Sequence, residues 1–195
     1  MPVDQTAPLD DGPKGQPSWF AVHTQHQHEK AAANSLTCKG FEVFLPLYST
    51  VRRWSDRNKE ISLPLFSSYL FLRGGLDRQL SILTTPGVFG LVSFAGVPAV
   101  IPDAEIDAVR QAITTGVQVN PHPFLKCGDW VRITQGPLEG LEGILVRTKG
   151  QFRLVLSVEL LQKSVVMEVD AWAVERARPV SQRSTQMNAD QATLL

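Results

Sequence analysis

The chain has 195 residues, enough for one large domain or two small ones, and 43% of them are hydrophobic, enough to form cores. Its 19 lysines and arginines balance 19 aspartates and glutamates, so any contact with nucleic acid must come from a local basic patch. Two cysteines in no metal or redox spacing, without a secretory signal, indicate the cytoplasm. Glycines and a proline interrupt the most apolar stretch, residues 88–101, so no membrane span is expected.

The first half of the chain alternates short apolar runs with helical patterns. Residues 1–17 are polar and rich in proline and glycine, and we expect them to be disordered. The Ala-rich stretch 29–39 predicts a helix that ends at Gly40, and a second helix begins near Asp103, a candidate N-cap. Strands are predicted at residues 19–22, 41–47, 69–72, 88–94 and 98–101, and a short helix or an irregular segment at residues 76–85.

Residues 48–63 have a different pattern, in which two β-prone arms flank a polar tip, and they predict a protruding hairpin. Its cationic side chains are Arg52, Arg53, Arg57 and Lys59. Such side chains neutralise phosphate, and Trp54 could stack on an unpaired base, so the hairpin is a candidate nucleic-acid contact. The alternative is a solvated hairpin with ordinary surface charges.

The most informative stretch is residues 126–150, KCGDWVRITQGPLEGLEGILVRTKG. A turn leads into a strand with period two, a loop rich in glycine and proline follows, and a second strand begins near Ile144. The turn and loop residues are Gly128, Asp129, Gly136, Pro137, Gly140 and Gly143. The last three glycines provide positions where positive φ costs little, and the whole pattern is typical of a bent corner in a small β-barrel.

This pattern divides the chain into parts. Residues 18–115 form a first domain, and residues 116–124, with two prolines in nine residues, are interpreted as a linker. The barrel takes residues 125–178, with later strands at 152–158, 165–169 and 172–175. Residues 179–195 are a polar tail that we expect to be disordered.

The stretch 126–150 resembles the KOW motif, and the part before it resembles the NGN domain of the NusG family. The matching segments occur in family order: WFAVHTQHQHEKAAANSL, GFEVFLPLY, RRWSD, PLFSSYLFL, TTPGVFGLVSF and IPDAEIDAV. The resemblance covers residues 18–178 and implies an α+β protein, an NGN α/β sandwich with an antiparallel sheet followed by a small KOW β-barrel. RRWSD and PLFSSYLF are most similar to the specialised RfaH-like and UpxY-like antiterminators. The family often has Pro-Gly or Pro-Asn where Ser67 and Ser68 stand, so we expect a less rigid loop here.

The resemblance implies an apolar cavity on the NGN domain that receives the tip of the clamp coiled coil of the largest RNA polymerase subunit. The matching positions are His23, Phe66, Tyr69 and Phe71. Period two directs Tyr69 and Phe71 to one strand face and Leu70 and Leu72 to the other, so one face can be core and the other the site. The alternative is that Phe66 and Phe71 are simply core.

Three further contacts follow from the resemblance. The hairpin matches a region near upstream DNA and the displaced non-template strand. A weaker match to a gate-loop contact covers Arg78, Gln79, Leu80 and Ser81, where a solvated helix end is the alternative. The apolar loop of the KOW domain, which binds a small-subunit ribosomal protein or the termination factor Rho, matches Leu160, Leu161, Lys163, Ser164 and Val166. Gln162 and Lys163 replace the usual Gly and Arg, which disfavours Rho, and at least one of the two leucines should be exposed.

The resulting hypothesis is a monomeric elongation and antitermination factor that suppresses pausing by binding and recruits a second partner. The alternative is a KOW-containing RNA-binding protein in ribosome assembly or translation. No catalytic set, cofactor motif or P-loop occurs, so we expect neither an enzyme nor a cofactor. A metal site at His23, His26, His28 and Glu29 is not expected, because further ligands at recognisable spacing are missing.

Overall fold

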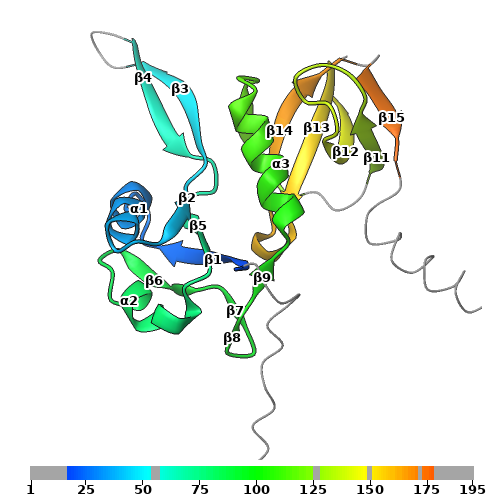
Figure 1. Cartoon of the computed structure of the whole chain (residues 1–195). Helices are drawn as coiled ribbons and strands as arrows, with labels where there is room; N and C mark the ends of the chain where they lie inside the picture. Colours follow the sequence, from blue (N-terminus) through cyan, green and yellow to red (C-terminus); the bar gives the residue numbers. More distant parts are fainter. Residues whose placement is uncertain (1–16, 54–57, 125–127, 149–150, 171–172, 178–195) are drawn as a thin grey trace, which may run out of the picture.

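A computed structural model describes residues 17–53, 58–124, 128–148, 151–170 and 173–177 (Figure 1). The two segments expected to be disordered, 1–17 and 179–195, lie outside the described residues except for Pro17. Trp54 and Arg57 of the predicted hairpin tip also lie outside them.

An antiparallel sheet organises the first half of the chain, in the order β2-β5-β1-β6 with β9 also paired to β1. Its strands are β1 (Trp19–Thr24), β2 (Glu42–Phe44), β5 (Tyr69–Arg73), β6 (Val88–Leu91) and β9 (Val100–Ile101). Two hairpins extend from it: β3 (Leu47–Arg53) with β4 (Asn58–Pro64), and β7 (Ser93–Phe94) with β8 (Val97–Pro98). The helices are α1 (Glu29–Cys38), η1 (Leu76–Arg78), α2 (Gln79–Leu83) and α3 (Asp103–Thr114). The predicted strands 41–47 and 88–94 are therefore each divided in two.

Alternation along the strands gives this sheet two buried faces. Val22, Leu70 and Leu72 face α1 and α2 and form one apolar core with them. Trp19, Ala21 and Phe71 point the other way into a second core, which also holds α3 residues such as Ile106. Because successive strand residues point to opposite sides, the period-two pattern of β1 and β5 alone specifies which residues enter which core.

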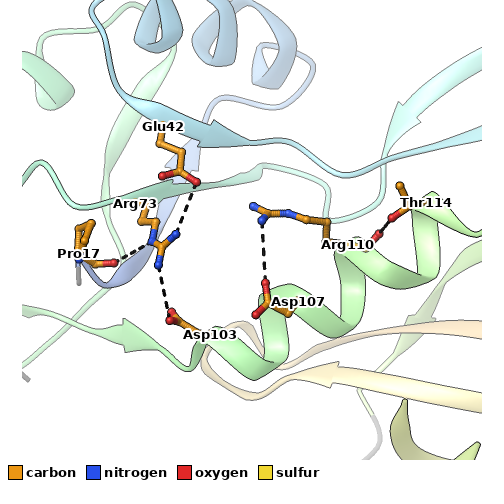
Figure 2. Close-up of polar contacts among 7 residues, drawn as sticks. All are labelled: Pro17, Glu42, Arg73, Asp103, Asp107, Arg110 and Thr114. Atoms are coloured by element: carbon orange, nitrogen blue, oxygen red, sulfur yellow. Dashed lines mark hydrogen bonds and ion pairs between the residues drawn. The ribbon is translucent and has the colours of Figure 1, made fainter. Parts of the chain in front are cut away.

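Two arginines hold α3 against this sheet, and Figure 2 shows the contacts of the first, Arg73. Arg73 lies 3.8 Å from Asp103, at the start of α3, and 3.9 Å from Glu42, and it donates a hydrogen bond to the carbonyl of Pro17. The Arg110 guanidinium lies 5.3 Å from the ring centre of Trp19. The expected N-cap at Asp103 is wrong, because Pro102 occupies that position and the Asp103 carboxylate pairs with Arg73 instead.

The second half forms a six-stranded antiparallel sheet in the order β10-β14-β13-β12-β11-β15. Its strands are β10 (Val119–Pro123), β11 (Asp129–Ile133), β12 (Glu142–Thr148), β13 (Gln151–Val158), β14 (Lys163–Val169) and β15 (Val174–Arg176), with a short helix η2 (Glu159–Leu161) between β13 and β14. The expected closed barrel is wrong in this respect: within the described residues, β10 and β15 end the sheet and do not pair with each other.

Strand β10 lies inside the range interpreted as a linker. It pairs with β14 along its whole length, from Val119 opposite Met167 to Pro123 opposite Lys163. Pro121 and Pro123 have the same parity, so their missing N–H groups lie on one side of the strand. Proline is tolerated in an edge strand when that side faces away from its neighbour, which explains both the strand and the open end of the sheet. Only residues 115–118 remain between α3 and β10.

The glycines of the KOW-like loop serve two different purposes. Gly136 and Gly140 have φ of 90° and 87°, as the sequence predicts for the bend before β12. Gly143 does not share this conformation, so the expectation of positive φ is wrong there. Instead, a methyl group at Gly143 would lie 2.6 Å from the carbonyl oxygen of Val155, so this glycine permits close approach of β12 to β13.

The two halves share one continuous core across α3, which runs beside the C-terminal sheet (Figure 1). Val109 and Ala112 of α3 belong to the same buried cluster as Leu154 and Leu156 of β13. Polar contacts support this packing: Gln111 of α3 donates a hydrogen bond to the carbonyl of Glu139 in the KOW-like loop. The halves are therefore docked against each other in this structure.

Candidate partner-binding surface

The four residues matched to polymerase binding lie close together on the sheet face that also carries α3. His23 of β1 is directly opposite Tyr69 of β5, and Ala21 is opposite Phe71. The rings of His23 and Tyr69 stack with their centres 5.2 Å apart. Phe66, in the turn before β5, meets Phe71 edge-on at 5.5 Å. Strand pairing thus gathers residues that are more than forty positions apart in the sequence.

Burial divides these four residues into two layers. Phe66 and Phe71 are 1% and 0% exposed, as the interpretation of them as core expects. His23 is exposed and Tyr69 is half-buried, so these two reach the surface. A rigid aromatic floor therefore lies beneath two rings that can contact a partner.

A third surface ring, Phe89 of β6, is 67% exposed and was not singled out from the sequence. Its ring centre lies 5.2 Å from that of His23. We call Tyr69, His23 and Phe89, on the neighbouring strands β5, β1 and β6, the aromatic row. The sequence signal for Phe89 was an aromatic next to Gly90 in a predicted strand, but only the pairing of β6 with β1 shows which ring it meets.

The loop matched to the KOW partner is packed rather than open. Leu161, Ser164 and Val166 are buried, and Leu160 is half-buried against the core shared by the two halves. The expectation that one leucine is exposed is therefore wrong, because η2 turns both toward packed surfaces. The Lys163 ammonium lies 5.7 Å from the ring centre of Tyr69. One contact thus joins a residue of each predicted binding site.

Glu105 provides a polar contact beside this apolar one. Its carboxylate, on the first turn of α3, accepts a hydrogen bond from the backbone N–H of Glu159 at 3.2 Å. Burial raises the pKa of Glu105, the nearby Glu159 carboxylate raises it further, and the hydrogen bond from the Glu159 backbone opposes both. Because the pKa of Glu105 is raised in the folded chain, its protonation adds stability at pH below the ordinary pKa of glutamate. That added stability is lost as pH rises through the raised pKa.

The β3–β4 hairpin carries several exposed basic side chains. Arg52 lies directly opposite Lys59, a pair of like charges that weakens a hairpin. Both side chains are exposed, as is Arg53, and among the described residues none of them forms an ion pair. At the base, Lys30 of α1 donates a hydrogen bond to the carbonyl of Ser62. The hairpin is therefore anchored at one end and cationic toward the other.

The four residues matched weakly to the gate-loop contact also differ from one another, because some are held by contacts and others are free at the surface. The Arg78 guanidinium lies 4.1 Å from the ring centre of Phe41 and donates a hydrogen bond to the carbonyl of Lys39, so it holds η1 in place. The carbonyl of Ser81 accepts a hydrogen bond from Lys39. Gln79 is exposed, and Leu80 is 75% exposed. Of the four residues, Gln79 and Leu80 present their side chains most freely.

Within the described ranges, no group of three or more His, Cys, Asp or Glu residues could hold a metal ion. Two of the neighbouring histidines have polar contacts: Nδ1 of His26 lies 3.1 Å from the Ser67 hydroxyl, and Nδ1 of His28 lies 3.2 Å from the carbonyl of His26. Among the described helices, none is both long and apolar enough to cross a membrane.

Comparison with known proteins gives consistent matches. The family model NusG, described as transcription termination factor nusG, matches residues 17–110. The transcription termination/antitermination protein NusG of Deinococcus radiodurans is 25% identical over 184 residues, which span 78% of this chain and 95% of that protein.

One solved structure shares the fold. A structure showing the domain interaction in Thermotoga maritima NusG has a TM-score of 0.52 at 17% identity, covering 84% of this chain and 98% of that one. An MjSpt4:Spt5 complex has a TM-score of 0.29 at 20% identity, covering 82% of this chain and 97% of that one. The family model and the relative lead to one conclusion: residues 17–110 form a NusG-family domain, in a chain that is similar to NusG over 78% of its length.

Proposed function

We propose that the chain is a transcription elongation and antitermination factor that binds RNA polymerase through the aromatic row and catalyses no reaction. The observation that carries this proposal is the row itself: Tyr69, His23 and Phe89 lie side by side at the surface, above a buried aromatic floor. Partly exposed rings on a rigid sheet are favourable anchors for a partner helix, because they bury much area at little entropic cost.

The proposed partner is the tip of the clamp coiled coil of the largest polymerase subunit, in the cytoplasm, with the chain acting as a monomer. Phe66 and Phe71 would take part by keeping the row in place, since neither reaches the surface. Bridging the cleft in this way would favour a closed clamp and suppress pausing. The likeness to RfaH-like and UpxY-like segments supports a specialised antiterminator rather than the housekeeping factor.

Replacing Tyr69 and Phe89 together by alanine should weaken binding of the full chain to a clamp coiled-coil fragment by at least roughly 30-fold. One aromatic anchor in an interface is typically worth about 2 kcal/mol, and both rings lie at the surface, so the fold should survive. Titration calorimetry measures the affinity, and circular dichroism checks the fold.

The matched control is Phe94→Ala, which removes an equally large exposed ring on β7, outside the row. Its affinity should stay within roughly twofold of the parent chain, as for most surface substitutions. If the Tyr69 and Phe89 double variant is folded and binds as well as Phe94→Ala, the row is not the polymerase site.

The hairpin is proposed to contact upstream DNA or the displaced non-template strand. The like-charged pair Arg52 and Lys59 supports this idea, because it costs hairpin stability and gains nothing within the described chain. Two adjacent cations on one hairpin face suit an anionic backbone. Trp54 and Arg57 stay part of the proposal, although they lie outside the described residues.

Lys59→Glu should separate stability from function in the hairpin. The new carboxylate would lie opposite Arg52 and exchange a repulsion for an attraction, a gain of about 0.2–1 kcal/mol, so the melting temperature should be kept or raised. Antipausing activity should fall. The slope of log affinity for an elongation complex against log salt concentration should become shallower by roughly one to two. Affinity measured at several salt concentrations tests this.

Arg176→Glu on β15 is the control, since it changes an exposed cation far along the chain from the hairpin. It should leave antipausing intact. Equal effects of Lys59→Glu and Arg176→Glu would mean that the hairpin carries only ordinary surface charge.

The η2 turn and the start of β14 are proposed to bind a small-subunit ribosomal protein rather than Rho. In the docked arrangement Leu160 and Leu161 pack inward, so this site must separate from α3 before it can be used. Lys163 covers Tyr69 in the same arrangement, so polymerase binding also requires separation. Each partner should therefore favour binding of the other, because both select the separated state.

A further inference from the structure

The turn that leads into Tyr69 contains an unfavourable backbone conformation. Ser68 has a φ of 68°, in the left-handed region that residues with a Cβ rarely adopt. Its neighbour Tyr69 closes the turn by donating its N–H to the carbonyl of Phe66 at 3.0 Å. Any relaxation of Ser68 would therefore redirect the chain between the floor residue Phe66 and the surface ring of Tyr69.

Both polar groups of the Ser68 backbone are held from outside the turn. Its N–H donates to Oε1 of Glu29 at 2.8 Å, and its carbonyl accepts from the N–H of Thr24 at 2.9 Å. Because Ser67 and Ser68 replace the usual residues, this loop is expected to be less rigid. The turn instead depends on a carboxylate from the first turn of α1.

Glu29 is an unusual residue in its own right. It is only 2% exposed, and the hydrogen bond from Ser68 is the one that its side chain makes within the described residues. A carboxylate is costly to bury, although the N-terminus of α1 offsets part of that cost. Glu29 does not cap its own helix either, since the side-chain bond goes to another segment. Its placement makes sense as a support for the turn.

We infer that Glu29 is a positioning residue for the partner-binding surface: it holds Ser68 in the left-handed conformation and thereby sets Tyr69 in the aromatic row. This inference rests on the proposed function of the row. It assigns to Glu29 an effect on partner affinity that acts through Ser68 and Tyr69, without any contact between Glu29 and the partner.

The test is a double-mutant cycle in the full chain with Glu29→Ala and Ser68→Gly. Glycine adopts positive φ without a steric penalty, so the turn should need the carboxylate less once Ser68 is replaced. Glu29→Ala alone should weaken binding to the clamp coiled-coil fragment about tenfold, but only about threefold in the Ser68→Gly background. Glu29→Gln retains an acceptor oxygen and should bind nearly as well as the parent chain.

A second readout follows the row without any partner. Proton NMR of the His23 ring reports its stacking on Tyr69, and this signal should shift in Glu29→Ala and return in the double variant. If Glu29→Ala does not fold, Ser68→Val tests the same turn, because a β-branched residue strongly resists positive φ and should shift the same signal with Glu29 intact.

The outcomes separate this inference from the proposed function. Equal losses of affinity in both backgrounds, or a His23 signal that ignores Glu29→Ala and Ser68→Val, would overturn the positioning role. The His23 signal could respond as expected while no variant, including Tyr69→Ala, changes the affinity for the coiled coil. That result would uphold the positioning of Tyr69 and reject the row as the polymerase site.

Discussion

Leu160→Asp is expected to raise the affinity of the full chain for the clamp coiled-coil fragment by about tenfold or more. Leu160 is half-buried against the core that joins the two halves, and a carboxylate placed in an apolar contact costs about 1–3 kcal/mol. That cost falls on the docked state alone. Apparent affinity is reduced by the fraction of molecules that cannot bind, so depleting the docked state restores it, at 1.4 kcal/mol per factor of ten.

Two controls make this result interpretable. Leu76→Asp changes a leucine of η1, exposed and outside the shared core, and should leave affinity unchanged. NMR relaxation should show the two halves tumbling together in the parent chain and separately in Leu160→Asp. Halves that separate without any gain in affinity would show that docking does not cover the polymerase site.

Phe71→Ala should lower the free energy of unfolding by about 3–5 kcal/mol, the range found for large aromatic residues removed from a core. Phe71 is fully buried in a central strand, and its ring lies 5.5 Å from that of Phe66 and 6.0 Å from that of Phe44. Domains of this size are stable by about 5–15 kcal/mol, so much of the native stability should be lost. Urea unfolding followed by circular dichroism measures the change.

The comparison variant is Tyr69→Ala, two residues along the same strand. Its half-buried ring should cost much less stability and, by the proposal above, much more partner affinity. Equal stability losses for Phe71→Ala and Tyr69→Ala would contradict the division into floor and row. The division also means that substitutions of Phe66 or Phe71 cannot test binding cleanly, because they damage the fold first.

Sequence reasoning succeeded where the determining interaction is local. Period two in residues 69–72 assigned Tyr69 and Phe71 to one face, and the loop glycines Gly136 and Gly140 have the positive φ that their spacing predicts. These features depend on neighbours a few residues away, which the sequence displays directly.

The sequence predictions that were wrong concern residues whose partners lie far away in the chain. Two prolines made residues 116–124 look like a linker, yet Pro121 lies in β10 opposite Val165, some forty residues later. Phe89 gained its place in the row only through the pairing of β6 with β1. Leu160 packs against a core that includes residues of α3, more than forty positions before it. Such partners are chosen by burial and register over the whole chain, which no local pattern encodes.

The pairing of β10 with β14 limits how far the segment that connects the two halves can extend. With β10 paired to β14, residues 115–118 can span roughly 13–14 Å when fully extended. If β10 detaches, its five residues add roughly 17 Å more. A pull from α3 loads Val119 first, so the strand should peel from that end one residue at a time rather than shear as a unit. The connection between the halves would thus lengthen under tension, as the proposed binding of polymerase and a second partner to separated halves requires.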